Sequence, residues 1–436
     1  MQALFIMCFF LLACGNTDSD TTEDKVNLKM VGTSYNIVIG NVNPADTAVT
    51  TVRWVGDPKL TYDLVLSNDE NYIKVPLTDK SIHESNNIRA LAISEKEIFD
   101  CLTKMQLDKK TSISLLLTVS DTEQNKKVTA NINISPNYPI LAKNMQMRDP
   151  FITVDREHNC YYLITPRWKD ERGGLIAYKS EDLESWKELG YVFNAEKDYL
   201  GTNDYWAPDT YEYEGNYYTF ITVSNPTRGI LRGTTILKST NGPTGPYHPV
   251  LPADRLNMTP ESMKCLDGSL FVDDSGTPWM IFSVEWDGPN VTDKVGEVWS
   301  QKLKKDLSDT DGEAHLLFKA SEASWIQRYI GGLITDAPFI WKDKASGNLI
   351  LTWSSFSPLY SIGQAISTSG NVLGPWTHEP VPIFSNDGGH QMIFEDLNGN
   401  LKISFHSPNE AVGSVRPTLT IMDIKIKDGK FEVINP

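Results

Sequence analysis

The chain has 436 residues, enough for two or three domains, and its 56 acidic and 40 basic side chains give a formal net charge of −16 at pH 7. Such a charge repels polyanions, so we expect neither nucleic acid nor a polyanionic substrate as a partner. The 11 tryptophans and 17 tyrosines suit a neutral carbohydrate, which stacks on aromatic rings, and equally an ordinary β-rich core.

Residues 1–13 form an apolar run that stops at Cys14. About twelve apolar residues are too few to span a bilayer, so the run is typical of a signal peptide. Leu11-Leu12-Ala13-Cys14 resembles the bacterial lipoprotein signal, in which the cysteine is lipidated, although no Lys or Arg precedes the run. An ordinary secretory signal is the alternative. We expect a flexible tether over residues 14–25 and a lipid anchor at Cys14 in the cell envelope, at the outer membrane or the cell surface.

Three later cysteines, Cys101, Cys160 and Cys265, are far apart and form no Cys-x-x-Cys pair. Their odd number and wide spacing predict neither a disulfide framework nor a zinc site. We expect all three to be buried thiols.

Short runs with alternating apolar residues predict a β-sandwich over residues 26–135. The predicted strands are residues 34–39, 61–67, 111–120 and 128–134. One helix is expected after Ser94, a candidate N-cap with Glu97 three residues later. The segment resembles the immunoglobulin-like N-terminal domains of surface glycan-utilisation lipoproteins. That resemblance implies a spacer role and, as further partners, other cell-surface glycan-utilisation proteins.

After a Pro-containing linker at residues 135–139, the chain repeats itself. Five segments start a short strand, pass through a turn and continue into an aromatic-rich second strand, at intervals of roughly 55 to 70 residues. The residues aligned at the strand starts are Asp149, Asp209, Asp267, Asp336 and His390. The repeat predicts a five-bladed β-propeller over residues 140–436 in an all-β chain. A parallel β-helix, the competing repeat fold, has much shorter periods.

The aligned residues of a propeller converge on one face of its central channel, so four carboxylates and an imidazole would meet there. Proximity and burial would push the pKa values of the carboxyls apart, as in many catalytic sites. The alternative is that these aspartates only cap turns. That alternative accounts for one or two of them, but not for the whole set.

Four motifs in these repeats resemble glycoside hydrolase family 43: Arg148-Asp149-Pro150, Trp206-Ala-Pro-Asp209, Leu266-Asp267-Gly268 and Thr335-Asp336-Ala-Pro338. The resemblance covers about residues 145–436. It implies an inverting hydrolase of arabinose- or xylose-containing glycans, of the arabinofuranosidase, xylosidase or arabinanase type, with no cofactor needed for the chemistry. It also implies Asp149 as the general base and Asp267 as the residue that orients the acid and raises its pKa.

The sequence offers two candidates for the general acid. The family normally has Glu-Gly-Pro where this chain has Asp336-Ala337-Pro338. Aspartate is shorter by one methylene, and a misplacement of about 1 Å can cost roughly a hundredfold in rate. Glu285, which a returning strand would bring back to the same face, is the rival acid. The sequence leaves both open.

The resemblance and the returning strands also give candidate ligand contacts. The predicted substrate-binding residues are Trp206, Asp209, Arg167, Trp168, Trp286 and Phe356. His390 lies where many family members have a histidine near a central ion. The resemblance therefore implies a structural calcium ion, with water molecules completing its coordination shell. The altered fourth-repeat acid and the lipid tether leave a second hypothesis, a non-catalytic surface propeller that only binds glycan.

Overall fold

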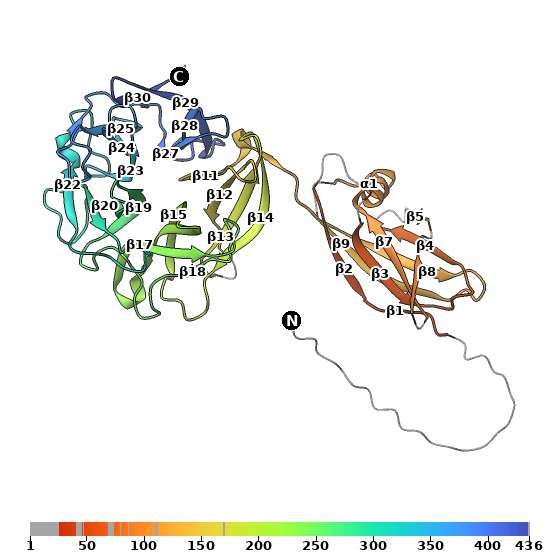
Figure 1. Cartoon of the computed structure of the whole chain (residues 1–436). Helices are drawn as coiled ribbons and strands as arrows, with labels where there is room; N and C mark the ends of the chain where they lie inside the picture. The colour runs from red at the N-terminus through yellow and green to blue at the C-terminus, as the bar shows by residue number, and fades with distance from the viewer. Residues whose placement is uncertain are drawn as a thin grey trace. The chain divides into compact units, whose positions relative to one another are not determined.

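The computed structural model describes residues 26–40, 46, 48–68, 74–78, 80–85, 87–109, 112–168 and 171–434. The chain divides into two compact units, Met1–Tyr138 and Pro139–Pro436 (Figure 1). The predicted signal peptide, Cys14 and the tether lie outside the described residues. None of the helices in the described ranges is long and apolar enough to cross a membrane. The fold is all-β, as the sequence predicts, with α1 as the single α-helix of the described part.

The described residues of the first unit form two sheets that share one apolar core, with Trp54 of β3 fully buried in it. One sheet has the order β1-β3-β7-β6, and the other has the order β2-β9-β8-β4-β5, with β2 and β9 parallel. The strands are β1 (Lys29–Met30), β2 (Ser34–Ile39), β3 (Ala48–Val55), β4 (Tyr62–Ser67), β5 (Lys74–Leu77), β6 (Ile82–Ser85), β7 (Ile88–Ser94), β8 (Ile113–Asp121) and β9 (Lys127–Pro136).

These strands confirm the four predicted from the sequence, within a few residues at each end, and add five that the pattern did not single out. The predicted helix is α1 (Glu95–Lys104). Its N-cap Ser94 accepts a hydrogen bond from the backbone N–H of Glu97 at 3.2 Å, and the Glu97 carboxylate accepts one from the backbone N–H of Ser94 at 3.0 Å. This reciprocal capping box satisfies two donors that the first helical turn would otherwise leave free.

The described residues of the second unit form five antiparallel sheets. In chain order they consist of β10 (Ile140–Leu141), β11 (Ile152–Asp155), β12 (Cys160–Pro166), β13 (Gly174–Ser180) and β14 (Ser185–Asn194); β15 (Asn203–Tyr213), β16 (Asn216–Asn225), β17 (Ile230–Ser239) and β18 (His248–Pro249); β19 (Cys265–Val272), β20 (Pro278–Val284), β21 (Glu297–Lys302) and β22 (His315–Lys319); β23 (Asp336–Lys342), β24 (Leu349–Phe356), β25 (Tyr360–Ser367) and β26 (Thr377–His378); β27 (Gly389–Glu395), β28 (Leu401–Ser407), β29 (Thr418–Lys427) and β30 (Lys430–Val433). Short 3₁₀ turns η1 (Ala142–Asn144), η2 (Pro226–Arg228) and η3 (Ala320–Glu322) interrupt them.

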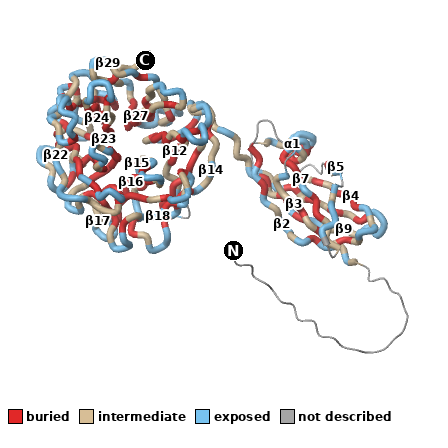
Figure 2. The backbone as a smooth tube through the Cα atoms, viewed as in Figure 1, coloured by how far each residue is buried: buried red, intermediate tan, exposed pale blue. Residues whose placement is uncertain are grey.

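The five sheets surround a central region, and each contributes one edge strand to its inner wall: β11, β15, β19, β23 and β27 (Figure 1). Each of these strands contacts the next one around the ring, and β27 contacts β11. Buried residues follow the sheets, whereas the exposed ones concentrate in turns and outer edges (Figure 2). The core therefore lies between neighbouring sheets, and the inner strand ends are left to line a site.

The second unit closes where its beginning meets its end. The backbone N–H of Met147 donates to the carbonyl of Pro417 at 2.9 Å, and the N–H of Leu419 donates to the carbonyl of Met145 at 3.1 Å. These bonds join the segment before β11 to the start of β29. We call this junction between the first and last sheets the seam.

A backbone feature recurs at the start of every inner strand. A non-glycine residue near each strand start has a positive φ: Asp149 (53°), Ala207 (48°), Asp267 (55°), Ala337 (48°) and His390 (56°). In β15, β19, β23 and β27 this residue falls at a shift in the strand register. In β15 the preceding Asp204 (72°) and Tyr205 (58°) have a positive φ as well. Non-glycine residues rarely adopt this conformation, and where they do they concentrate at functional sites.

This feature corrects the alignment of the repeats that we made from the sequence. The residues equivalent to Asp149, Asp267 and His390 are Ala207 and Ala337, not Asp209 and Asp336. Asp209 lies two residues beyond the equivalent position, and Asp336 lies one residue before it. The acids were misleading markers because the feature that recurs in all five repeats is a backbone conformation rather than a side chain.

The three cysteines predicted to be buried thiols, Cys101, Cys160 and Cys265, are free and buried. This prediction is confirmed.

Candidate active site

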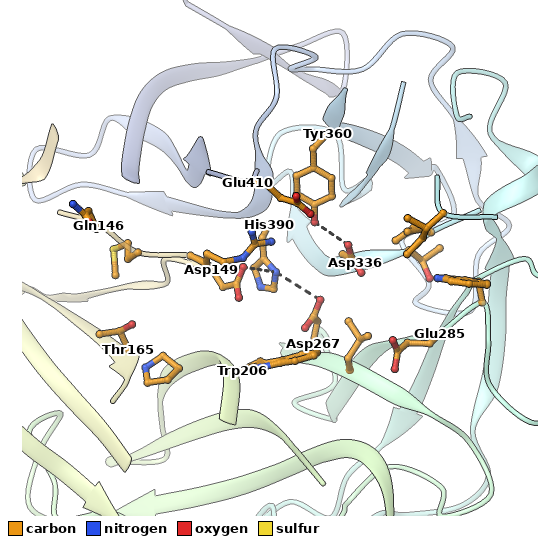
Figure 3. Close-up of a pocket in the computed structure, with 18 residues that line it drawn as sticks. Gln146, Asp149, Thr165, Trp206, Asp267, Glu285, Asp336, Tyr360, His390 and Glu410 are labelled. Atoms are coloured by element: carbon orange, nitrogen blue, oxygen red, sulfur yellow. Dashed lines mark hydrogen bonds and ion pairs between the residues drawn. The ribbon is translucent and has the colours of Figure 1, made fainter. Parts of the chain in front are cut away.

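A cavity of about 720 Å³ opens among the starts of the inner strands (Figure 3). Five acidic side chains line it, together with two tryptophans, one histidine and one tyrosine. The full lining consists of Gln146, Met147, Arg148, Asp149, Thr165, Pro166, Trp206, Leu266, Asp267, Glu285, Trp286, Ile330, Ile334, Thr335, Asp336, Tyr360, His390 and Glu410. All four residues predicted as catalytic, Asp149, Asp267, Asp336 and Glu285, therefore face one cavity.

Asp149 is held by two imidazoles. Its Oδ1 lies 3.2 Å from Nδ1 of His390 and 3.3 Å from Nδ1 of His406, and its backbone N–H donates to Nδ1 of His406 at 3.2 Å. Burial on its own would raise the pKa of Asp149, but His390, His406 and Arg148 outweigh it and hold that pKa below its ordinary value. Asp149 is therefore an ionised carboxylate at neutral pH.

His406 supports Asp149 in its neutral form. Burial lowers the pKa of His406 to about 4, so the ring is uncharged near neutrality. Because Nδ1 accepts the Asp149 N–H, the ring proton belongs on Nε2, which lies 3.5 Å from Oδ1 of Asn409. The guanidinium of Arg148 donates to the same Asn409 Oδ1 at 3.0 Å and to the Asn409 carbonyl.

Asp267 is buried between its neighbours. Its Oδ2 accepts the backbone N–H of Ala337 at 3.0 Å and lies 3.6 Å from Nδ1 of His390, which thus stands between Asp149 and Asp267 (Figure 3). Burial, with added repulsion from Asp336 and Asp149, raises the pKa of Asp267 well above its ordinary value. Its environment favours the protonated form.

Asp336 begins β23 and faces the cavity beside Tyr360, whose hydroxyl donates to Oδ2 of Asp336 at 2.9 Å. Burial raises the pKa of Asp336 to about 7; repulsion from Glu285 and Asp149 adds to the rise, and the Tyr360 hydrogen bond opposes it. A large fraction of this carboxyl is therefore protonated at neutral pH, in the same cavity as the ionised Asp149.

Glu285 follows β20 and is bound by cations. Its Oε2 accepts a hydrogen bond from Arg232 at 2.6 Å and lies 3.5 Å from Nζ of Lys264. Burial raises the pKa of Glu285, although both cations oppose that rise. Glu285 therefore differs from Asp336, whose side-chain hydrogen bond comes from a neutral hydroxyl.

Trp206 is 42% exposed although it lines the cavity. The guanidinium carbon of Arg232 lies 4.0 Å from the centre of its ring, and Nε of Arg232 lies 3.2 Å from Oδ2 of Asp204. Arg232 thus joins the Trp206 ring to two acids, Asp204 and Glu285. The arrangement offers a fixed aromatic surface on which a sugar ring could stack.

Trp286 also lines the cavity, and its ring occupies the space beside Gly332. A Cβ at Gly332 would lie 2.3 Å from that ring. Only glycine leaves room for Trp286 there.

The structure does not bring four of the predicted substrate contacts to the cavity. The guanidinium of Arg167 turns to Glu188 and Tyr178, at 2.7 and 3.0 Å. Trp168 packs edge-on against Tyr205 and is 46% exposed outside the cavity. Phe356 stacks on Tyr329, with ring centres 3.8 Å apart. Asp209 lies behind the lining, where it accepts a hydrogen bond from Tyr211 at 3.3 Å.

Several lining residues escaped the sequence analysis, above all Tyr360, Glu410, Gln146 and Thr165. Tyr360 starts the third strand of its sheet, a position to which the repeat assigned no function. Glu410 lies in the loop between β28 and β29, where no periodic pattern exists. Among the lining residues without a predicted role, Arg148 belongs to a motif that the sequence singled out, Arg148-Asp149-Pro150.

The surroundings of His390 fit calcium poorly. Calcium takes six to eight oxygen ligands, whereas Nδ1 of His390 is engaged with the carboxylates of Asp149 and Asp267. Within the described ranges, no group of three or more His, Cys, Asp or Glu side chains is arranged to hold a metal ion. We derive no step through calcium.

Comparison with known proteins adds an independent line of argument. The model of the family described as glycosyl hydrolases family 43 matches residues 137–431. Among solved structures, the endo-arabinase from Bacteroides thetaiotaomicron is 47% identical, with a TM-score of 0.60 over 67% of this chain and 99% of that one.

Two relatives are more distant in sequence. The β-D-galactofuranosidase xynD from Aspergillus niger is 26% identical over 311 residues, which cover 67% of this chain and 82% of the relative. The extracellular exo-α-(1→5)-L-arabinofuranosidase ArbA from Cellvibrio japonicus is 27% identical over 270 residues, which cover 58% of this chain and 72% of the relative.

Proposed function

The chain belongs to glycosyl hydrolases family 43, and on that premise we propose that this glycoside hydrolase cleaves arabinose- or xylose-containing glycans with inversion at the anomeric carbon. One observation carries the proposal. A single cavity holds one carboxyl whose pKa is lowered, Asp149, and one whose pKa is raised to about 7, Asp336. Hydrolysis with inversion needs such a pair, because one carboxylate must accept a proton while a carboxylic acid donates one.

The reaction then proceeds in one displacement. Ionised Asp149 takes a proton from a water molecule as the water oxygen forms its bond to the anomeric carbon. The bond from that carbon to the leaving oxygen breaks, and Asp336 gives its proton to the leaving oxygen. Afterwards Asp149 is protonated and Asp336 ionised, and exchange with solvent restores both.

We assign the acid role to Asp336 rather than Glu285. Both carboxyls line the cavity, but Arg232 and Lys264 attract the ionised form of Glu285. Asp336 has a neutral hydroxyl as its hydrogen-bond partner, so its proton is retained at lower cost. Asp267 fixes the strand start that carries Asp336 through the N–H of Ala337.

The substrate class rests on the relatives, two of which act on arabinose-type linkages by their names. The exposed Trp206 ring supports the proposal, since an uncharged sugar can stack on it. The strongly negative chain also favours a neutral glycan.

We further propose that the five sheets of the second unit are the blades of a five-bladed propeller, and that the first unit is an immunoglobulin-like spacer. The lipid anchor at Cys14 in the cell envelope, at the outer membrane or the cell surface, stays a proposal from the sequence. Incorporation of labelled palmitate into the wild-type chain and its loss in Cys14→Ala would test it.

The experiment that tests the function measures sugar release from arabino- and xylo-oligosaccharides and from aryl pentosides by the full chain and by Asp149→Asn. Asparagine keeps the shape and tolerates the positive φ, so the variant removes the base and little else. We expect a loss of about 10² to 10⁴ in kcat, and a first-formed sugar of inverted configuration by NMR.

Asp428→Asn is the matched control. Asp428 has the same φ of 53° but lies exposed in the turn between β29 and β30, so its variant should keep full activity. If wild type and Asp149→Asn release the same negligible sugar yet both bind glycan in affinity gels, the proposed hydrolysis is wrong and the binding hypothesis returns.

A further inference from the structure

Tyr360 makes the single side-chain hydrogen bond that the described residues provide to Asp336. Its hydroxyl donates to Oδ2 at 2.9 Å, and Figure 3 shows the Tyr360 hydroxyl pointing at this carboxyl. Tyr360 starts β25, two strands from β23 in the same sheet. Because the Tyr360 hydroxyl donates to Oδ2, Oδ2 is the hydrogen-bond acceptor of the Asp336 carboxyl. The proton of neutral Asp336 then belongs on Oδ1.

The ring of Tyr360 has little freedom to move. It is 2% exposed and packs against the ring of Phe356, 5.0 Å away between centres, and against His406, 5.8 Å away and nearly parallel. A Cβ on Gly389 would lie 2.3 Å from a ring carbon of Tyr360. Because Gly389 has no side chain, it leaves a notch that the Tyr360 ring fills.

Burial and the neighbouring acids raise the pKa of Tyr360 well above its ordinary value. The hydroxyl therefore remains protonated over the working range of a glycoside hydrolase. Tyr360 is a permanent donor at a fixed place.

We propose that Tyr360 is the positioning residue that orients Asp336 for proton donation, by holding Oδ2 so that the proton-bearing Oδ1 points to the leaving oxygen. The inference rests on the proposed role of Asp336 as the acid. A short carboxyl that reaches less far depends more on its orientation, because displacement of a reacting group by about 1 Å can cost roughly a hundredfold in rate.

The first test is Tyr360→Phe, which keeps the ring in its notch and removes the hydroxyl. We expect kcat on substrates with poor leaving groups to fall by about 10- to 100-fold, with a much smaller effect on activated aryl glycosides. Because the hydroxyl lowers the pKa of Asp336, its loss should also move the basic limb of the kcat/KM profile to higher pH. An equal loss on every substrate with no shift of the limb would overturn the proposal.

Tyr247→Phe is the matched control. Tyr247 is also 2% exposed and donates its hydroxyl to a backbone carbonyl, that of Pro243, at 3.0 Å, but it does not line the cavity. Its variant should alter neither the leaving-group dependence nor the pH profile. A second probe, 3-fluorotyrosine at position 360, has a stronger donor and nearly the same shape, so it should move the basic limb to lower pH.

A double variant separates this inference from the proposed function. In Asp336→Asn no proton can be donated from position 336, so adding Tyr360→Phe should have no further effect. If the full Tyr360→Phe loss persists in Asp336→Asn, Tyr360 acts by another route and the inference is wrong. If Asp336→Asn itself keeps wild-type activity on poor leaving groups, the proposed acid is wrong instead.

Discussion

The backbone N–H of Ala337 donates to Oδ2 of Asp267 at 3.0 Å, so the third sheet of the second unit holds the strand start that carries Asp336. The bond joins two residues that both have positive φ. The Asp267 carboxyl thus also fixes the backbone of Ala337, next to the proposed acid Asp336.

Asp267→Asn should separate the titratable group of Asp267 from its hydrogen bond to Ala337. The amide oxygen can still accept the Ala337 N–H, and the variant removes only the titratable group at position 267. Because its raised pKa favours the neutral form, Asp267 places no charge on Asp336 near pH 7, so the basic limb of the kcat/KM profile should stay at its wild-type position in Asp267→Asn. Asp267→Ala also removes the acceptor, and we expect it to lose about tenfold or more in kcat relative to Asp267→Asn. Equal kcat for Asp267→Asn and Asp267→Ala would contradict the role of the Asp267–Ala337 hydrogen bond, and a shifted basic limb in Asp267→Asn would show that Asp267 is charged there.

The wild-type enzyme should have a bell-shaped dependence of kcat/KM on pH. Asp149 must be ionised, and its pKa lies below the ordinary value, so activity should rise with pH on a limb below about pH 4. Asp336 must be protonated, so activity should fall as pH rises through about 7. Initial rates at substrate concentrations far below KM measure both limbs. A basic limb that stays in place in Asp336→Asn would show that another group causes it.

Substrates with different leaving groups should identify the acid. We expect Asp336→Asn to lose about 10² to 10⁴ in kcat on oligosaccharides, which need a donated proton, and to spare aryl glycosides with good leaving groups. Glu285→Gln removes an ion-pair partner of Arg232 and should change both substrate types alike. The reverse result would move the acid role to Glu285, and equal mild effects of both variants would remove it from both.

Trp206→Ala should weaken substrate binding without changing the chemistry. We expect KM for arabino-oligosaccharides to rise about tenfold, with kcat little changed, because a stacking surface binds ground state and transition state alike. Trp168→Ala is the control, since Trp168 is similarly exposed but lies outside the cavity. A rise in KM for Trp168→Ala of the same size would show that substrate extends beyond the cavity described above.

The first unit can be tested by its helix cap. Ser94→Ala removes the acceptor of the Glu97 N–H and should destabilise that unit by about 1 kcal/mol. In urea unfolding of the full chain, followed by circular dichroism, the transition of the first unit should shift to lower urea. Activity should stay at the wild-type value, because α1 and the cavity belong to different units. A parallel loss of activity would contradict this independence.

The sequence predicted the all-β fold, and all four predicted catalytic residues line one cavity. Asp149, Asp267 and Asp336 were found because a repeat places its strand starts around a common axis, and Glu285 because a returning strand leads back to the same face. The sequence misaligned Asp209 because the true equivalent is Ala207, which has no polar side chain to mark it. The shared feature is a backbone angle, and a side-chain pattern does not encode it directly.

Side-chain direction was the other limit. Arg167 follows Thr165 and Pro166, which line the cavity, yet its guanidinium is hydrogen-bonded to Glu188 and Tyr178 on neighbouring strands of its own sheet. Tyr360 reaches the cavity because Gly389, far along the chain, leaves room for its ring. Both outcomes depend on contacts between residues distant in sequence, which periodicity does not contain.

The proposed base lies on the seam. Two residues before it, the backbone N–H of Met147 donates to the carbonyl of Pro417. The N–H of Asp149 donates to His406 of β28, and Arg148 donates to Asn409 in the loop between β28 and β29. The position of the proposed base therefore depends on the junction between the first and last sheets, which no direct chain connection joins. Heat or denaturant that separates the first sheet from the last should abolish activity while most strands are still paired. Loss of activity would then report local opening at the seam before the second unit unfolds.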